Sequence, residues 1–148
     1  VREHARMSRR SRAREVALQS LYQLDLTGEQ APGPERLASL HRFHRGRLRS
    51  APLVAFADSL VEGVLARRDE LDAALERRSE NWRLFRMAAT DRTVLRIAAF
   101  ELAHTDTPPA VVADEAIELA RRYGGEQSPR FVAGILGRLL DDVAAEKT

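Results

Sequence analysis

The 148-residue sequence contains no cysteine. This absence excludes disulfide bonds, thiolate metal sites and cysteine nucleophiles. No apolar run reaches the roughly eighteen residues that a transmembrane helix needs, and the N-terminus is charged rather than signal-like. We therefore expect a soluble, cytoplasmic protein with no membrane attachment, whose core is stabilised by side-chain packing alone.

Strand patterns are missing as well, because no alternation of apolar and polar residues persists along the chain. Apolar residues instead recur at helical spacing. A chain of this length is expected to form one domain that buries roughly two thirds of its unfolded surface. These features predict an all-α fold, a compact bundle of about six or seven helices.

Charge is distributed unevenly between the two parts of the chain. Residues 1–50 hold 11 arginines against 5 acidic residues, whereas residues 51–148 hold 13 basic and 17 acidic residues. The first part thus carries a net charge of +6 and the second part −4. A basic front on a mildly acidic body favours an anionic partner that docks at one end.

The segment Asp91–Ala103 is apolar on almost every side of a helix, interrupted only by Arg96 and Glu101. Such a helix is usually buried on most sides, so we predict a central helix with the others packed around it. Thr90 and Asp91 can cap its first turn. Glu101 is expected to have a cationic or amide partner, or to reach the surface.

Further helices follow from the spacing of apolar residues and from turn residues. We expect the first helix to be capped by Ser8 or Ser11, and a loop at Thr27–Pro34. The remaining expected helices are a short one in Glu35–Arg49, the longest one from Pro52 to about Ser79, one at Asp114–Tyr123 that Gly124 and Gly125 end, and a last one starting at Ser128-Pro129. Trp82, Phe85 and Met87 are expected to form an aromatic turn before the central helix.

Candidate catalytic and metal-binding groups are sparse. His41 and His44 lie one helical turn apart, but no third ligand is evident, so a metal pair is disfavoured. The acidic residues of Asp114–Glu118 have no nucleophile or histidine near them in sequence, which favours surface acids over an acid/base cluster. The residues by themselves point to neither catalysis nor a metal.

The basic front has two interpretations. Arginines crowd residues 1–14, and a short basic run of this kind can be a solvated tail. However, these arginines precede or begin a helix, where the helix dipole disfavours cations. A bound polyanion would compensate for this placement. We predict a flexible basic extension over residues 1–8 and a single helical domain over residues 9–148.

Three segments together resemble the NusB family of transcription antitermination proteins. They are RSRAREVALQSLYQLDL (Arg10–Leu26), DRTVLRIAAFEL (Asp91–Leu102) and VVADEAIELARRYGGEQSPRFVAGIL (Val111–Leu136). Trp82, ahead of the second segment, adds to the resemblance. Each segment alone is common in helices, but the three in this order are specific.

The resemblance implies two small helical subdomains around a central buried helix, with no catalysis, no cofactor and no metal. It implies binding to the single-stranded boxA element of ribosomal RNA leader transcripts. It also implies two partners: NusE, a ribosomal protein that acts as an elongation factor, and the elongating RNA polymerase.

The same resemblance assigns roles to particular residues. The family's arginine-rich start corresponds to Arg9, Arg10, Arg12 and Arg14, which are expected to contact RNA, and Gln19 resembles a position facing the same RNA. The family's FVNG stretch corresponds to residues 131–134, so Phe131 is expected to stack on a base beside Arg130. From the residues alone, Phe131 is more simply a core side chain. Tyr22 and Asp91 resemble positions that face NusE, and without the family they are a half-buried ring and a helix cap.

Two departures affect the expected RNA edge. Ala133 stands where the family usually has asparagine, and Gln127 stands where it often has an acid. Two other functions remain open. One is a helical adaptor that binds only proteins. The other is a relative of the N-terminal RNA-binding domain of ribosomal RNA cytosine methyltransferases, which would need a downstream cofactor-binding α/β domain.

Overall fold

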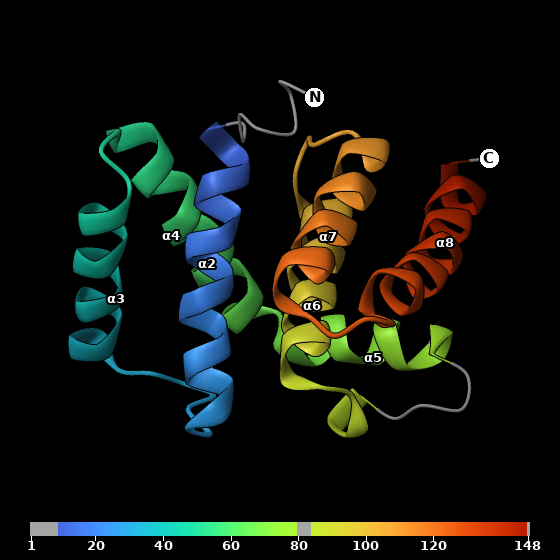
Figure 1. The fold of residues 1–148 in the computed structure, drawn as a ribbon, viewed down its shortest axis with the longest axis horizontal. Helices are drawn as coiled ribbons and strands as arrows, with labels where there is room; N and C mark the ends of the chain where they lie inside the picture. Colours follow the sequence, from blue (N-terminus) through green and yellow to red (C-terminus); the bar gives the residue numbers. More distant parts are fainter. Residues whose placement is uncertain (1–8, 80–83, 148) are drawn as a thin grey trace. The chain divides into compact units, whose positions relative to one another are not determined.

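The computed structural model describes residues 9–79 and 84–147 of the chain. Within these residues it contains seven α-helices, one short 3-10 helix and no strand, which confirms the all-α prediction (Figure 1). The chain forms two compact units, Val1–Leu65 and Ala66–Thr148, here called unit 1 and unit 2. The expected flexible extension over residues 1–8 and the expected contribution of Trp82 to an aromatic turn lie outside the described residues.

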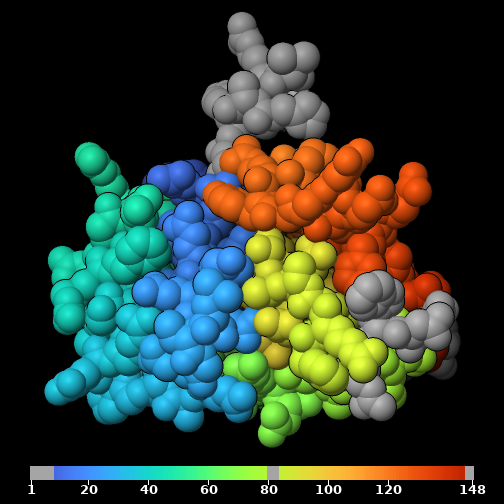
Figure 2. Space-filling model, turned by 60° about the horizontal axis from the view of Figure 1, so that its bottom comes forward, coloured from blue at the N-terminus to red at the C-terminus, as the bar shows by residue number. Residues whose placement is uncertain are grey.

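Unit 1 contains α2 (Arg9–Leu26), α3 (Pro34–Arg47) and α4 (Ala51–Ala66). The start of α2, the end of α3 and the start of α4 lie at the same end of this unit (Figure 1). Figure 2 shows the surface where α2, in blue, lies beside α3, in teal. A buried cluster joins the three helices at this end, with contributions from Ala13, Val16, Leu48, Val54 and Ala57.

The chain leaves α2 through a turn that requires glycine. Gly28 has a φ of 74°, in the left-handed region that other residues avoid. The amide of Gly28 donates a hydrogen bond to the carbonyl of Asp25 at 3.2 Å. The amide of Glu29 donates one to the carbonyl of Leu24 at 2.9 Å. This pair of bonds is a Schellman motif, which satisfies the last carbonyls of the helix. It places the loop before α3 where the sequence predicts it.

Unit 2 contains α5 (Arg68–Arg78), the 3-10 helix η1 (Leu84–Arg86), α6 (Ala89–His104), α7 (Pro109–Tyr123) and α8 (Ser128–Lys147). Helix α6 contacts α5, α7 and α8. Every residue from Thr93 to Glu101 is buried. This confirms the central helix, since a helix that is apolar all round is stable only when other helices cover it.

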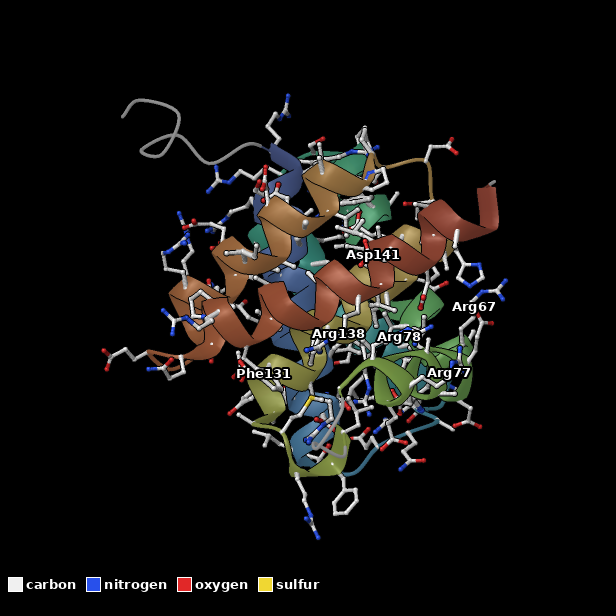
Figure 3. The ribbon with its side chains drawn as sticks, turned by 90° about the vertical axis from the view of Figure 1, so that its right-hand side faces the viewer. Arg67, Arg77, Arg78, Phe131, Arg138 and Asp141 are labelled. Atoms are coloured by element: carbon white, nitrogen blue, oxygen red, sulfur yellow. The ribbon has the colours of Figure 1, made fainter. Side chains whose placement is uncertain are left out.

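The charged groups inside unit 2 have specific partners. The guanidinium of Arg96, 6% exposed, donates two hydrogen bonds to Asp72 of α5, at 2.7 and 3.0 Å. Glu101 accepts a hydrogen bond from the hydroxyl of Thr107 at 3.1 Å. Arg78 of α5 pairs with Asp142 of α8, and Arg138 of α8 donates to the carbonyl of Arg78 at 2.7 Å (Figure 3). These bonds tie α5 to α6 and to α8.

The predicted long helix from Pro52 to about Ser79 is wrong. The chain forms two helices there, because Arg67 leaves the helical conformation with φ −116° and ψ 20°. Unit 1 ends next to this break. No glycine or proline marks the position, and the apolar spacing continues across it from Val64 to Leu71. Among the described helices the longest is therefore α8, with 20 residues.

Three helix starts also differ from the predictions. Helix α6 begins at Ala89 with Ala88 as its cap, so Thr90 and Asp91 lie inside the first turn instead of capping it. Ser11 lies inside α2, which already includes Arg9, and Ser8 is outside the described residues. Helix α7 begins at Pro109, five residues before the predicted start at Asp114. Proline suits the first helical turn, where its missing amide is not needed.

Candidate nucleic-acid interface

The start of α2 presents its arginines in two different environments. Arg9, Arg10 and Arg12 are exposed, whereas Arg14 is only 3% exposed. The guanidinium carbon of Arg10 lies 4.4 Å from the ring centroid of Phe56 in α4, and that of Arg14 lies 5.2 Å from it. A guanidinium at this distance over an aromatic face is attracted by the ring. Phe56 thus holds two of the four arginines against the surface of unit 1.

Arg12 and Gln19 lie on one face of α2, because residues seven positions apart are two helical turns apart. Arg12 also lies 3.7 Å from the buried carboxylate of Glu15. Gln19 and Tyr22, one turn apart, are both half-buried. This face therefore carries an exposed cation, an amide and a phenol in a line along the helix.

The start of α8 is fixed by a tight turn. Helix α8 begins at Ser128, as predicted, but the Ser128 hydroxyl accepts a hydrogen bond from the amide of Gly125 at 2.9 Å, in the preceding turn. A β-carbon on Gly124 would lie 2.5 Å from the Ser128 hydroxyl oxygen, so this position accepts only glycine without a rearrangement. The turn sets the direction in which the first residues of α8 leave the bundle.

Phe131 and Arg130 lie in this first turn of α8. Arg130 is exposed, and Phe131, which is labelled in Figure 3, is half-buried. The next residue, Val132, is fully buried at 0%. Ala133, in place of the family's asparagine, is half-buried and brings no amide to the surface. Phe131 is thus neither a full core residue nor a free one, so part of its ring remains available for a ligand.

Asp91 lies in the first turn of α6 and is 8% exposed. Its Oδ1 atom is buried and has no hydrogen-bond partner among the described residues. A buried carboxylate oxygen without a donor is costly, although the amides at a helix N-terminus favour a negative charge. The structure thus leaves a hydrogen-bond acceptor unsatisfied at this position.

The predicted site residues divide between the two units. The four arginines, Gln19 and Tyr22 share one helix of unit 1. Arg130, Phe131 and Asp91 belong to unit 2. The structure therefore brings together the first six on α2, and brings Arg130 and Phe131 together on α8.

The sequence did not single out Phe56, which is one of several apolar residues in the helix predicted from Pro52 to about Ser79. No local pattern reveals that two arginines from another helix lie over its ring. The histidine pair also has a different role from metal binding. His41 and His44 each hydrogen bond to one carboxylate oxygen of Asp58 at 2.6 Å, and His44 also bonds to Ser20 at 2.8 Å. Within the described residues, no group of three ligating side chains could hold a metal ion.

Comparison with known proteins decides the family. A sequence model of the NusB family matches residues 11–141. The chain belongs to the NusB family. The transcription antitermination protein NusB of Anaeromyxobacter dehalogenans (strain 2CP-1) is 47% identical over 133 residues, which cover 89% of this chain and 90% of that protein. The NusB of Rubrobacter xylanophilus is 45% identical over 138 residues, 93% of each chain.

Solved structures of the family have the same fold. The structure of T. maritima NusB is 32% identical and covers 90% of each chain with a TM-score of 0.77. A solved complex of the antitermination factors NusB and NusE with double-stranded RNA has a chain that is 23% identical, with a TM-score of 0.78, covering 93% of this chain and 99% of that one. At this identity the second similarity concerns the fold alone. NusB proteins are transcription antitermination factors and not enzymes.

None of the described helices is long and apolar enough to span a bilayer.

Proposed function

We propose that this NusB-family protein binds boxA-type single-stranded RNA of ribosomal RNA leader transcripts together with NusE, and associates with the elongating RNA polymerase in the cytoplasm. The observation that carries the proposal is the exposed group Arg9, Arg10 and Arg12 at the start of α2. Cations concentrated at one helix end suit the closely spaced phosphates of a nucleic acid. The solved NusB–NusE complex with double-stranded RNA, one chain of which has the same fold, supports both classes of partner, RNA and NusE.

The proposed RNA contacts come from α2 and from the start of α8. Arg9, Arg10, Arg12 and Arg130 contact phosphates directly, while the buried Arg14, whose guanidinium lies over the ring of Phe56, contributes its charge without direct contact. The Gln19 amide can donate to the same strand. Phe131 stacks on an unpaired base through the exposed part of its ring. Residues 9–148 act as one RNA-binding domain in this proposal.

Tyr22 and Asp91 are proposed to face NusE. For Asp91, the family resemblance supports this role, and its buried, unsatisfied Oδ1 would accept a donor from the partner once the side chain turns outward. For Tyr22, a half-buried phenol combines an apolar ring with a polar tip, the combination that is enriched in protein interfaces.

The experiment that tests the proposal measures the binding of a short boxA-like RNA with and without purified NusE. The controls are the same RNA annealed to its complement and an RNA of scrambled sequence. We expect the single strand to bind more tightly than both controls, and NusE to tighten its binding further. If NusE binds but no RNA does, the protein is a helical adaptor for proteins alone. Equal binding of all three RNAs would instead indicate a basic surface without specificity.

A variant of Phe131 separates base stacking from core packing. Phe131→Ala is expected to weaken RNA binding by about 1–3 kcal/mol, because base–aromatic stacking contributes that much. Its effect on the unfolding free energy should stay below the roughly 3–5 kcal/mol that a fully buried phenylalanine loses. Val132→Ala, at the buried neighbouring position, is the control. It should lower stability and leave the affinity of the folded protein unchanged. A large stability loss with normal affinity would remove Phe131 from the site.

A further inference from the structure

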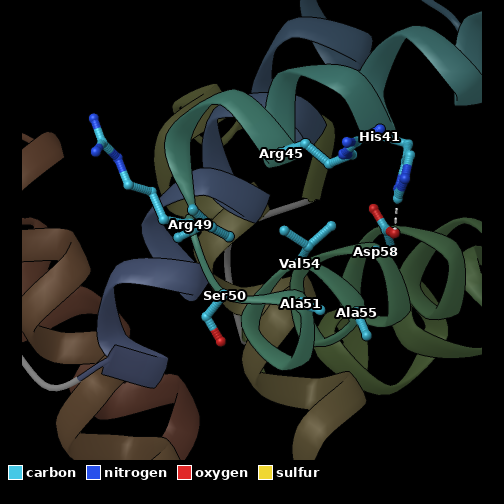
Figure 4. Close-up of a pocket in the computed structure, with 9 residues that line it drawn as sticks. His41, Arg45, Arg49, Ser50, Ala51, Val54, Ala55 and Asp58 are labelled. Carbon is cyan, nitrogen blue, oxygen red and sulfur yellow. Dashed lines mark hydrogen bonds and ion pairs between the residues drawn. The ribbon is translucent and has the colours of Figure 1, made fainter.

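Unit 1 has an open hollow of about 480 Å³ between the end of α3 and the first half of α4 (Figure 4). Its volume falls within the roughly 300–1,000 Å³ of typical small-molecule sites. One wall comes from α3, the other from α4, and the connection between them closes one end. Its lining includes His41, Arg45, Leu48, Arg49, Val54 and Ala55.

The hollow combines cations at its rim with an apolar floor. Arg45 and Arg49 are exposed, and neither has an ion-pair partner within residues 9–79 and 84–147. Leu48 and Val54 are buried beneath them. The acidic group of the lining is Asp58, whose two carboxylate oxygens already bond to His41 and His44. Cations above an apolar wall fit a ligand that has both a phosphate and a flat apolar face.

The hollow is continuous with the basic start of α2. Ala13 and Val16 of α2 pack in one buried cluster with Leu48 and Val54 of the hollow. Residues 9–14 and 42–57, which meet at this end of unit 1, hold eight arginines and no acidic residue. In Figure 4 the side chain of Arg49 extends outward from the rim of the hollow and not into it. The arginines of residues 42–57 therefore lie at the same end of unit 1 as the α2 arginines, around the hollow and not inside it.

We propose that this hollow binds a nucleotide of single-stranded RNA that flanks the segment held by the α2 arginines. The proposal rests on RNA binding by α2 and extends the RNA surface across the α3–α4 connection. Arg45 and Arg49 neutralise two further phosphates, and a base or ribose lies against Leu48 and Val54. RNA is favoured over a protein partner because a protein interface has an apolar exposed centre. Among the described residues of unit 1, the large exposed apolar side chain is Leu26, at the other end of α2.

The test compares two single-stranded RNAs, one of about 12 nucleotides, which is within the roughly 4–16 nucleotides that one single-strand-binding domain covers, and the same RNA extended by about six nucleotides at each end. The variants are the Arg45→Gln/Arg49→Gln double substitution and, as a control for charge, Arg77→Gln/Arg86→Gln in unit 2. Each single-strand phosphate contact is worth about fivefold in affinity at 100 mM salt, from a slope of about −0.7 per contact. The first variant should thus bind the extended RNA about 25-fold more weakly than the wild type, and its salt slope should be flatter by about 1.4. Its affinity for the short RNA, and the affinities of the control for both RNAs, should not change.

A second variant tests the shape of the hollow without changing any charge. Ala55 is exposed on the wall from α4, and Ala55→Trp fills the space beside Val54. It should weaken binding of the extended RNA alone, with an unchanged melting temperature. If both variants bind both RNAs like the wild type, the hollow is not an RNA site, although RNA binding by α2 stands. If the wild type binds neither RNA, both proposals fail. Loss of NusE binding with intact RNA binding would make the hollow a protein-binding surface and overturn the inference.

Discussion

Raising the salt concentration from 50 to 200 mM is expected to lower the affinity for a short single-stranded RNA about fiftyfold. The proposed phosphate contacts come from four exposed cations, namely Arg9, Arg10 and Arg12 of α2 and Arg130 of α8. With about −0.7 per neutralised phosphate, four contacts give a slope of log affinity against log salt near −2.8. A fourfold rise in salt then produces the stated loss.

Removing the three exposed arginines of α2 should flatten this slope. The variant Arg9→Gln/Arg10→Gln/Arg12→Gln loses three of these four contacts, so its slope should be near −0.7. Glutamine keeps most of the helix propensity of arginine, which limits the effect on folding. The matched control is Arg77→Gln/Arg86→Gln/Arg121→Gln, which removes the same charge from exposed positions of unit 2. Titration of a labelled RNA at four salt concentrations measures both slopes. Equal slopes for the two triple variants would mean that the start of α2 only keeps the protein in solution.

The central helix was predictable because its signal is local. An uninterrupted run of apolar residues around a helix has one stable arrangement, namely burial, and the buried stretch Thr93–Glu101 follows from it. The partners of its charges were not predictable. Asp72, which binds Arg96, lies 24 residues earlier on another helix, and its sequence pattern indicates only a solvated face paired with Arg68. Pairing across helices depends on packing geometry, which composition does not reveal.

The break between α4 and α5 was missed for a related reason. The apolar residues Leu60, Val64, Leu71 and Leu75 continue at helical spacing through Arg67. All four are buried, on both sides of the break. Only Arg67 departs from helical backbone geometry, and the apolar residues of α4 and of α5 stay buried. The spacing of these residues nevertheless predicts one continuous helix. Tertiary packing therefore overrides the local preference at this position.

The candidate site was predictable in composition but not in detail. Charge and the family resemblance select the α2 arginines, yet only the structure distinguishes the exposed Arg10 from the buried Arg14. Both lie over Phe56, whose position depends on how α4 packs in unit 1. The hollow beside α3 is likewise formed by residues that are unremarkable in the sequence. Their importance arises from packing between helices.

Leu95→Ala is expected to lower the free energy of unfolding by about 2–5 kcal/mol, because the substitution leaves a cavity in a core that relaxes only partly. Leu95 is 0% exposed, and α6 is in contact with three other helices of unit 2. For a chain of this size, each kcal/mol lowers the melting temperature by roughly 2–4 °C, so the melting temperature should fall by about 4–20 °C.

Leu26→Ala is the matched control, because it makes the same chemical change at a helical position that is 62% exposed. An exposed substitution of this kind usually changes stability by less than about 0.5 kcal/mol. Thermal and urea denaturation of the wild type and both variants measure the difference. A loss below about 1 kcal/mol for Leu95→Ala would contradict the burial of α6, since the transfer of a leucine side chain from water alone accounts for more than that. A larger loss for Leu95→Ala than for Leu26→Ala attributes the difference to the burial of Leu95, because both substitutions delete the same atoms.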